Sequence, residues 1–239
     1  MRLAKYLARA GVASRRQAEV LISEGRVEVN GQVVEKPQTL VEDQDKVTVN
    51  GSLVENVESK CYLLLHKPPG YISTVKDTYN RPTVLDLING IEARLYPVGR
   101  LDADTSGILL LTNDGEMAFR LTHPSFQVKK KYLALVSGIP NRESLDTLRK
   151  GVAIENHHTA PAGVKLLERK VQINKALLEL TLIEGKKGQV KKMCRAINHP
   201  VVKLHREEFA GLKVGELPEG KYRFLSEQEV KWLYRLVKL

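Results

Sequence analysis

Short apolar segments joined mostly by turns constrain the fold of this chain more than any other feature. Each has the length of a strand, and they lie at residues 62–65, 108–111, 132–136, 178–183 and 201–204. Helical patterns lie at residues 83–89, 116–121, 144–150, 190–197 and 227–237. Several strands therefore follow one another without the helical crossover that parallel pairing requires. The sequence predicts an α+β fold with a largely antiparallel mixed sheet flanked by helices.

The N-terminal residues carry a separate pattern. Apolar residues at helical spacing predict a helix at 3–10, and a capping box of Ser14 with Gln17 predicts the start of a second one. Asn-Gly pairs at 30–31 and 50–51 follow alternating valines and predict two tight hairpins. This pattern is typical of a small module of two helices and hairpins.

A polar stretch without periodicity, residues 55–60, follows this module and indicates a linker. We therefore predict two domains, at residues 1–58 and 59–239.

The charge balance favours a polyanionic partner. The chain has 38 Lys and Arg against 28 Asp and Glu, a net charge of +10. A basic soluble protein without such a partner is the alternative. Basic residues cluster, however, on the predicted exposed side of the first two helices and again at 129–131 and 186–195. Clustered like charges repel one another unless an anion binds there.

Other features of the sequence argue against membrane proteins, secreted proteins and disulfide-rich proteins. The apolar runs are too short to span a bilayer, no basic amphipathic helix favours a membrane surface, and the N-terminus lacks the apolar core of a secretory signal. The two cysteines, Cys61 and Cys194, lie far apart and form no disulfide framework. We expect a protein of the reducing cytoplasm with no membrane partner.

The densest polar stretch, residues 99–107, runs directly into an apolar strand. A rigid strand is a usual support for catalytic side chains on the adjoining loop. Asp102 and Asp104 in this stretch have two interpretations from the residues alone. They form a D-x-D metal site, or they cap backbone amides of a turn, which is the commoner use of aspartate. No cluster of histidines or carboxylates lies nearby in the sequence, so the metal interpretation is the weaker one.

Residues 99–115, Gly-Arg-Leu-Asp-Ala-Asp-Thr-Ser-Gly-Ile-Leu-Leu-Leu-Thr-Asn-Asp-Gly, closely resemble the catalytic motif of bacterial ribosomal-RNA pseudouridine synthases. The same family's other motifs are similar to residues 67–71, 131–132, 189–193 and 204–207. Residues 2–7, 14–16 and 25–31 resemble an S4 RNA-binding domain. The Leu-His-Arg-Glu run and the absence of a basic tail resemble the small-subunit branch of the family more than the large-subunit branch.

The resemblance implies isomerisation of a uridine in ribosomal RNA, without metal or cofactor. It implies that Asp102 is the catalytic carboxylate and that Lys191 is its cationic partner. It also implies that Tyr132 stacks on the target base and that its hydroxyl can transfer a proton at C5. More distant relatives have arginine in place of Lys191, so Lys192 or Arg100 could share its role. From the residues alone, Tyr132 is also compatible with a strand aromatic packed in the core, but the three lysines before it favour a functional role. A basic helix end is the weaker alternative for Lys191, which lies near the start of the predicted helix.

The predicted RNA contacts combine the basic clusters with the family motifs. They are Arg2, Lys5, Arg15, Arg16, Arg26, Arg100, Lys129, Lys130, Lys131 and Lys192. The expected partner is ribosomal RNA, most simply 16S rRNA or a small-subunit assembly intermediate, bound by a monomer. The alternatives are a 23S rRNA enzyme of the same family, a non-enzymatic ribosome-assembly factor, and a metal-dependent phosphodiesterase using Asp102 and Asp104.

Overall fold

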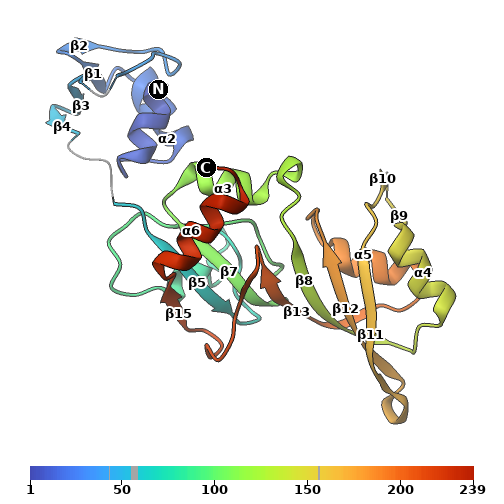
Figure 1. Ribbon diagram of the computed structural model, residues 1–239. Coiled ribbons are helices and arrows are strands. Elements are labelled where there is room, and N and C mark those ends of the chain that lie inside the picture. Colours follow the sequence, from blue (N-terminus) through green and yellow to red (C-terminus); the bar gives the residue numbers. More distant parts are fainter. Residues whose placement is uncertain (43, 55–58, 156) are drawn as a thin grey trace. The chain divides into compact units, whose positions relative to one another are not determined.

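The computed structural model describes residues 1–42, 44–54, 59–155 and 157–239 (Figure 1). The chain forms two compact units, the first made of residues 1–61, 92–94 and 113–115 and the second of the remaining residues. The predicted domain boundary at residue 58 and most of the predicted linker lie outside the described residues. That boundary therefore stays a prediction.

The first unit packs two helices against a four-stranded sheet. The helices are α1 (Leu3–Arg9) and α2 (Arg15–Ser23). The sheet has the order β2 (Gln32–Val33), β1 (Val27–Val29), β3 (Val47–Val49) and β4 (Ser52–Leu53). Leu3, Leu7, Ile22 and Val27 are fully buried between the helices and the sheet. Helical spacing on one side and strand alternation on the other thus supply one shared core.

The local signals of this unit are confirmed. Ser14 accepts a hydrogen bond from the backbone N–H of Gln17, whose side chain completes the capping box of α2. Asn30 and Gly31 have φ angles of 53° and 78°, as a type I′ hairpin turn between β1 and β2 requires. The second Asn-Gly pair joins β3 to β4 in the same way.

The second unit is built on one large sheet, and its strand order confirms the α+β prediction. The order is β11 (Gly163–Lys170), β12 (Lys175–Leu182), β8 (Lys130–Ser137), β13 (Val201–Phe209), β7 (Ser106–Thr112), β5 (Tyr62–Lys67) and β15 (Tyr222–Phe224). Two short strands, β6 (Tyr96–Pro97) and β14 (Leu212–Lys213), pair with β7 and β13. Within the described ranges every pairing in this sheet is antiparallel except β13 with β7.

Helices cover the sheet in two groups, each with its own apolar core. One core joins α4 (Arg142–Lys150) and α5 (Gln189–Ala196) to β8, β11, β12 and β13. The other joins α3 (Gly115–Thr122) and α6 (Glu227–Leu236) to β5 and β7 (Figure 1). A separate two-stranded ladder pairs β9 (Ala153–Ile154) with β10 (His157–His158). The parallel contact between β13 and β7 is therefore a seam between two half-sheets.

Three short 3₁₀ turns complete the elements: η1 (Val84–Leu87), η2 (Pro124–Phe126) and η3 (Val171–Ile173). The helix predicted at 83–89 is wrong, because η1 closes only one turn and Ile88 already has an extended backbone. Val84 is the one apolar residue of that turn that is buried, so no continuous apolar face extends it.

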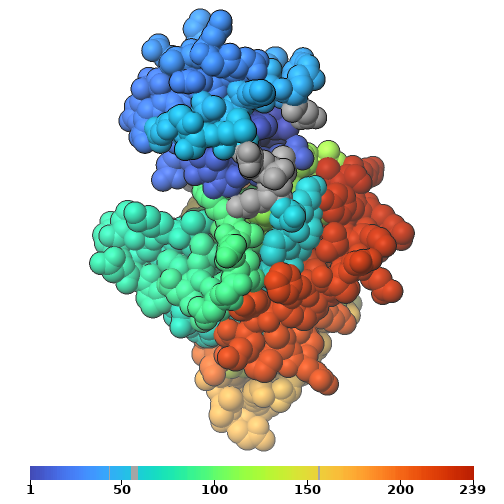
Figure 2. Space-filling model, turned by 90° about the vertical axis from the view of Figure 1, so that its left-hand side faces the viewer, coloured from blue at the N-terminus to red at the C-terminus, as the bar shows by residue number. Residues whose placement is uncertain are grey.

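In Figure 2 the segment between β5 and β7, turquoise to green, gathers in one lobe.

Gly107 permits the close approach of the two half-sheets. Its φ of +115° is rarely adopted by residues with a side chain. A Cβ at this position would lie 2.3 Å from the backbone oxygen of Arg206 on β13. Residues Arg206 and Gly107 are partners in the parallel register, so the missing side chain lets β7 and β13 pair at this point.

We predict that Gly107→Ala destabilises the protein by about 3 kcal/mol or more, because the methyl group collides with backbone that cannot move aside. Gly215→Ala is the matched control, since Gly215 also has a positive φ, +61°, but faces open space. The control should lose only about 1 kcal/mol. Urea unfolding of both variants measures the difference, and equal losses would contradict the collision at the seam.

Candidate active site

A cavity of about 200 Å³ opens beside the seam of the large sheet. Its walls come from both half-sheets: the loop before β7, the inner strands β8, β12 and β13, and the connection from β12 into α5. The lining residues are Gly99, Arg100, Leu101, Asp102, Thr105, Tyr132, Leu182, Glu184, Gly185, Lys186, Lys187, Gly188, Gln189, Val190 and Leu204. The structure thus brings the motif at 99–107 together with Tyr132 and with the start of α5.

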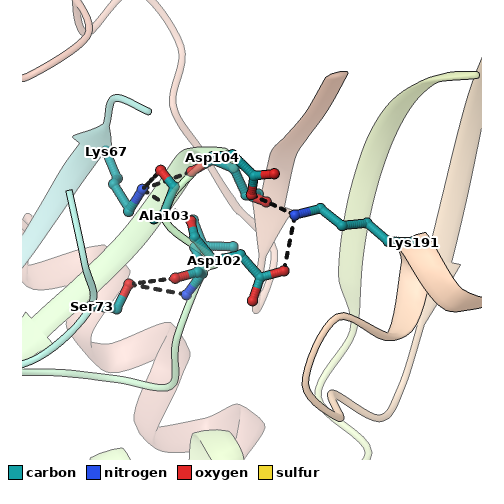
Figure 3. Close-up of polar contacts among 8 residues, drawn as sticks. Lys67, Ser73, Asp102, Ala103, Asp104 and Lys191 are labelled. Atoms are coloured by element: carbon teal, nitrogen blue, oxygen red, sulfur yellow. Dashed lines mark hydrogen bonds and ion pairs between the residues drawn. The ribbon is translucent and has the colours of Figure 1, made fainter. Parts of the chain in front are cut away.

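Asp102 projects toward Lys191, which lies in the first turn of α5 (Figure 3). The Lys191 Nζ donates to Asp102 Oδ2 over 3.1 Å, and the Asp102 side chain is 36% exposed. A carboxylate in this position remains accessible from the cavity while the ammonium stabilises its negative charge. Asp104 also accepts from the Lys191 Nζ, over 2.5 Å.

A buried lysine fixes the turn that carries Asp102. Lys67, at the end of β5, is fully buried, and its Nζ donates to the backbone oxygens of Pro68, Asp102, Ala103 and Thr105 over 2.8–3.2 Å. Burial lowers the pKa of the Lys67 ammonium to about 8, while the charges of Asp104 and Asp102 act in the opposite direction. Charge-assisted bonds to carbonyls hold a turn more firmly than neutral ones do.

Ser73 fixes the residue before Asp102. Its hydroxyl donates to the backbone oxygen of Leu101 over 3.0 Å and accepts from the Leu101 N–H over 3.1 Å (Figure 3). Sequence reasoning placed Lys67 in a motif without a role and did not single out Ser73. A lysine between an apolar strand and a Pro-Pro pair was the only available signal for this support.

Tyr132 is half-buried in β8 and lines the cavity. It is paired with Leu180 on β12 and with Arg206 on β13, so neighbouring strands fix its backbone on both sides. Because paired residues project to the same face of a sheet, Leu180 and Arg206 share the cavity face with Tyr132. The ring is thus both packed and partly accessible, which combines the two interpretations that the sequence left open.

The three lysines before Tyr132 lie in different environments. Lys129 is exposed, whereas Lys130 is only 8% exposed and donates to the backbone oxygen of Val128 over 2.8 Å. Burial lowers the pKa of Lys130 to about 8. The Lys131 Nζ lies 3.5 Å from a carboxylate oxygen of Glu208. Direct phosphate contact by Lys130, predicted from the sequence, does not fit its burial, because strand β8 begins at this residue and turns it inward.

Arg100 and Lys192 flank the site. Arg100 is exposed and lines the cavity. Lys192 forms an ion pair with Glu155 over 2.7 Å. Of the three cations considered as partners of Asp102, Lys191 is the one whose ammonium contacts it.

The predicted RNA-contacting residues of the first unit are all exposed: Arg2, Lys5, Arg15, Arg16 and Arg26. Arg26 also contacts Glu24 and Asn50. Among the described residues, no group of three or more His, Cys, Asp or Glu side chains is arranged to hold a metal ion. No helix in the described ranges has the length and apolar character needed to cross a membrane.

Known proteins resemble this chain over nearly its whole length. Ribosomal large subunit pseudouridine synthase B of Bacillus subtilis is 48% identical over 98% of this chain and 96% of its own. An uncharacterized RNA pseudouridine synthase of Aquifex aeolicus is 40% identical over 100% of this chain and 96% of its own. A crystal structure of a pseudouridylate synthase, 30% identical, superposes with a TM-score of 0.70 over 98% of this chain and 99% of that one.

The family model for the S4 domain matches residues 1–47, which confirms the resemblance of the N-terminal module. The family model for RNA pseudouridylate synthase matches residues 61–196, the part that contains Asp102, Tyr132 and Lys191. With this match and the full-length relatives, the chain belongs to the RNA pseudouridine synthase family, a family of isomerases, and carries an N-terminal S4 domain.

Proposed function

We propose that this protein converts a uridine of large-subunit ribosomal RNA into pseudouridine, with Asp102 as the catalytic carboxylate. The observation that carries the proposal is the Asp102 carboxylate at the cavity, paired with Lys191 and held on a turn that Lys67 fixes. A preorganised anion in a small cavity is suited to chemistry at a single nucleotide that has left its stack.

The reaction breaks the C1′–N1 bond, turns the uracil and joins C1′ to C5; C5 then loses its proton and N1 gains one. Atoms and electrons balance within the nucleotide, so no oxidant or phosphate donor is consumed. Asp102 acts either by attacking C1′ or by removing the 2′ proton, and a carboxylate is suited to both routes. Lys191 favours the ionised carboxylate in either case.

Tyr132 supplies the surface on which the base stacks. Its ring lies in the same cavity as Asp102, beside the apolar side chains of Leu182 and Leu204. Aromatic stacking and apolar contacts hold a base of any orientation, which suits a base that must rotate. Exposed Arg100 at the cavity is placed to hold a flanking phosphate.

The choice of large-subunit RNA departs from the small-subunit target that the sequence motifs suggested. The Bacillus subtilis relative, 48% identical, is named for the ribosomal large subunit. That identity over nearly the full chain outweighs the short Leu-His-Arg-Glu run on which the 16S expectation was based. The exposed basic residues of the S4 domain would bind the phosphates of RNA segments that lie outside the cavity. We further propose that the protein acts in the cytoplasm and as a monomer.

Mapping of pseudouridine in ribosomal RNA tests both parts of the proposal. In cells that lack the gene, we expect one or a few pseudouridines to disappear from 23S rRNA, with 16S rRNA unchanged. A plasmid copy should restore them, and an Asp102→Asn copy should not, because the amide has nearly the same shape but is neither a base nor a nucleophile. The level of the variant protein is the control for folding.

Two outcomes would contradict the proposal in different ways. Loss of a pseudouridine from 16S rRNA would overturn the large-subunit target and leave the activity. Restoration by the Asp102→Asn copy would remove Asp102 from the reaction.

Tyr132→Phe separates the hydroxyl from the ring. We expect slower pseudouridine formation with an unchanged melting temperature and retained RNA binding, because the aromatic face remains. Tyr132→Ala should lose turnover and some affinity. Rates, RNA affinities and melting temperatures of both variants are to be compared, and full activity of Tyr132→Ala would exclude Tyr132 from the site.

A further inference from the structure

Lys191 is shared between two carboxylates that differ in position. Its Nζ lies 3.1 Å from Asp102 Oδ2 and 2.5 Å from Asp104 Oδ1 (Figure 3). Asp102 lines the cavity, whereas Asp104 is 74% exposed and is not one of the lining residues. The shorter contact of the ammonium is thus made to the carboxylate that does not line the cavity.

An exposed carboxylate at this place is unfavourable for RNA binding. The surrounding protein carries a net charge of +10, and each phosphate that passes the cavity is repelled by a nearby anion. Affinity for RNA alone would therefore favour a neutral residue at position 104. Its negative charge has a local partner in Lys191, which indicates a role within the site.

We propose that Asp104 is a positioning residue that holds the Lys191 ammonium and limits how strongly its charge stabilises Asp102. The inference rests on the proposed function. An ammonium bound to Asp102 alone would stabilise that anion most, and a strongly stabilised anion is a weaker base and a weaker nucleophile. When the ammonium is shared between two carboxylates, it stabilises Asp102 less, which leaves Asp102 a stronger base and nucleophile.

The pKa shifts of Lys191 and Asp104 agree with an ammonium that is shared between the two carboxylates. Burial lowers the pKa of Lys191, but its hydrogen bonds to Asp104 and Asp102, together with the negative charges of these two groups, more than offset burial, so the pKa is raised. The hydrogen bond from Lys191 also lowers the pKa of Asp104. Lys67, the other cation near Asp104, donates to backbone oxygens and so does not replace Lys191 as its partner.

Asp104→Asn tests the proposal through two kinetic effects, which oppose each other in kcat/KM. We expect kcat to fall about tenfold, because Lys191 then pairs with Asp102 alone. We expect KM for the RNA to fall about two- to threefold, because an anion near the phosphates is removed. The acid limb of the pH–rate profile should move to lower pH. Asparagine retains the turn-forming tendency of aspartate, and Asp104→Ser serves as a second neutral variant.

Glu155→Gln is the matched control. Glu155 is an exposed carboxylate paired with Lys192, the residue next to Lys191 on α5, over 2.7 Å. This variant also removes one negative charge beside the helix, so KM should fall while kcat stays at the wild-type value. An unchanged kcat in Asp104→Asn, or an equal fall in both variants, would overturn the proposal.

A second measurement needs no catalysis. Titration of the Lys191 side chain by NMR in the RNA-free protein, assigned with Lys191→Arg, should show a lower pKa in Asp104→Asn and no change in Glu155→Gln. An unchanged Lys191 titration in Asp104→Asn would overturn the positioning role. Failure of the wild-type protein to form pseudouridine would instead refute the proposed function, and the titration would still decide whether Asp104 holds Lys191.

Discussion

The buried ammonium of Lys67 is the interaction on which the geometry of the site depends. Four backbone oxygens converge on its Nζ, three of them from the turn between Asp102 and Thr105. Carbonyls that point inward to one cation cannot point outward, so the turn has one arrangement and its aspartates project away from the sheet. Without this cation, the Asp102 and Ala103 carbonyls would keep backbone donors, the N–H groups of Thr105 and Gly70. The Thr105 carbonyl would lose its 2.8 Å bond to the ammonium, at a cost of about 1–3 kcal/mol.

The cluster around Asp102 is a chain of alternating charges. Lys67 lies behind the turn, Asp102 and Asp104 lie on it, and Lys191 faces both carboxylates from α5 (Figure 3). Each charged group lies next to one of opposite sign, and these contacts offset the unfavourable free energy of burying the charges. The Asp102 carboxylate is nevertheless not fully neutralised, because Lys191 is shared with Asp104. The cavity thus contains a carboxylate, although the chain as a whole is strongly basic.

Sequence patterns predicted the elements well where the signal is local. The capping box of Ser14 and the Asn-Gly hairpins each depend on neighbouring residues. Environments that depend on distant residues were missed. The burial of Lys67 depends on backbone oxygens up to 38 residues away. Lys130 looked like part of a basic loop, but pairing with Leu182 and Phe209 extends β8 to include it. Strand β11, in which lysines and leucines alternate poorly, was not predicted.

The seam between the two half-sheets divides the residues of the site into two groups. The half with β5 and β7 carries Asp102 and its support, and the half with β8, β12, β13 and α5 carries Tyr132, Lys191 and most of the cavity wall. The two groups are not independent, because the Lys191 ammonium of the second half contacts the Asp102 carboxylate of the first. Divergence of the cavity shape is therefore able to proceed at apolar wall residues such as Leu182 and Leu204, whereas the contact of Lys191 with Asp102 constrains the position of α5.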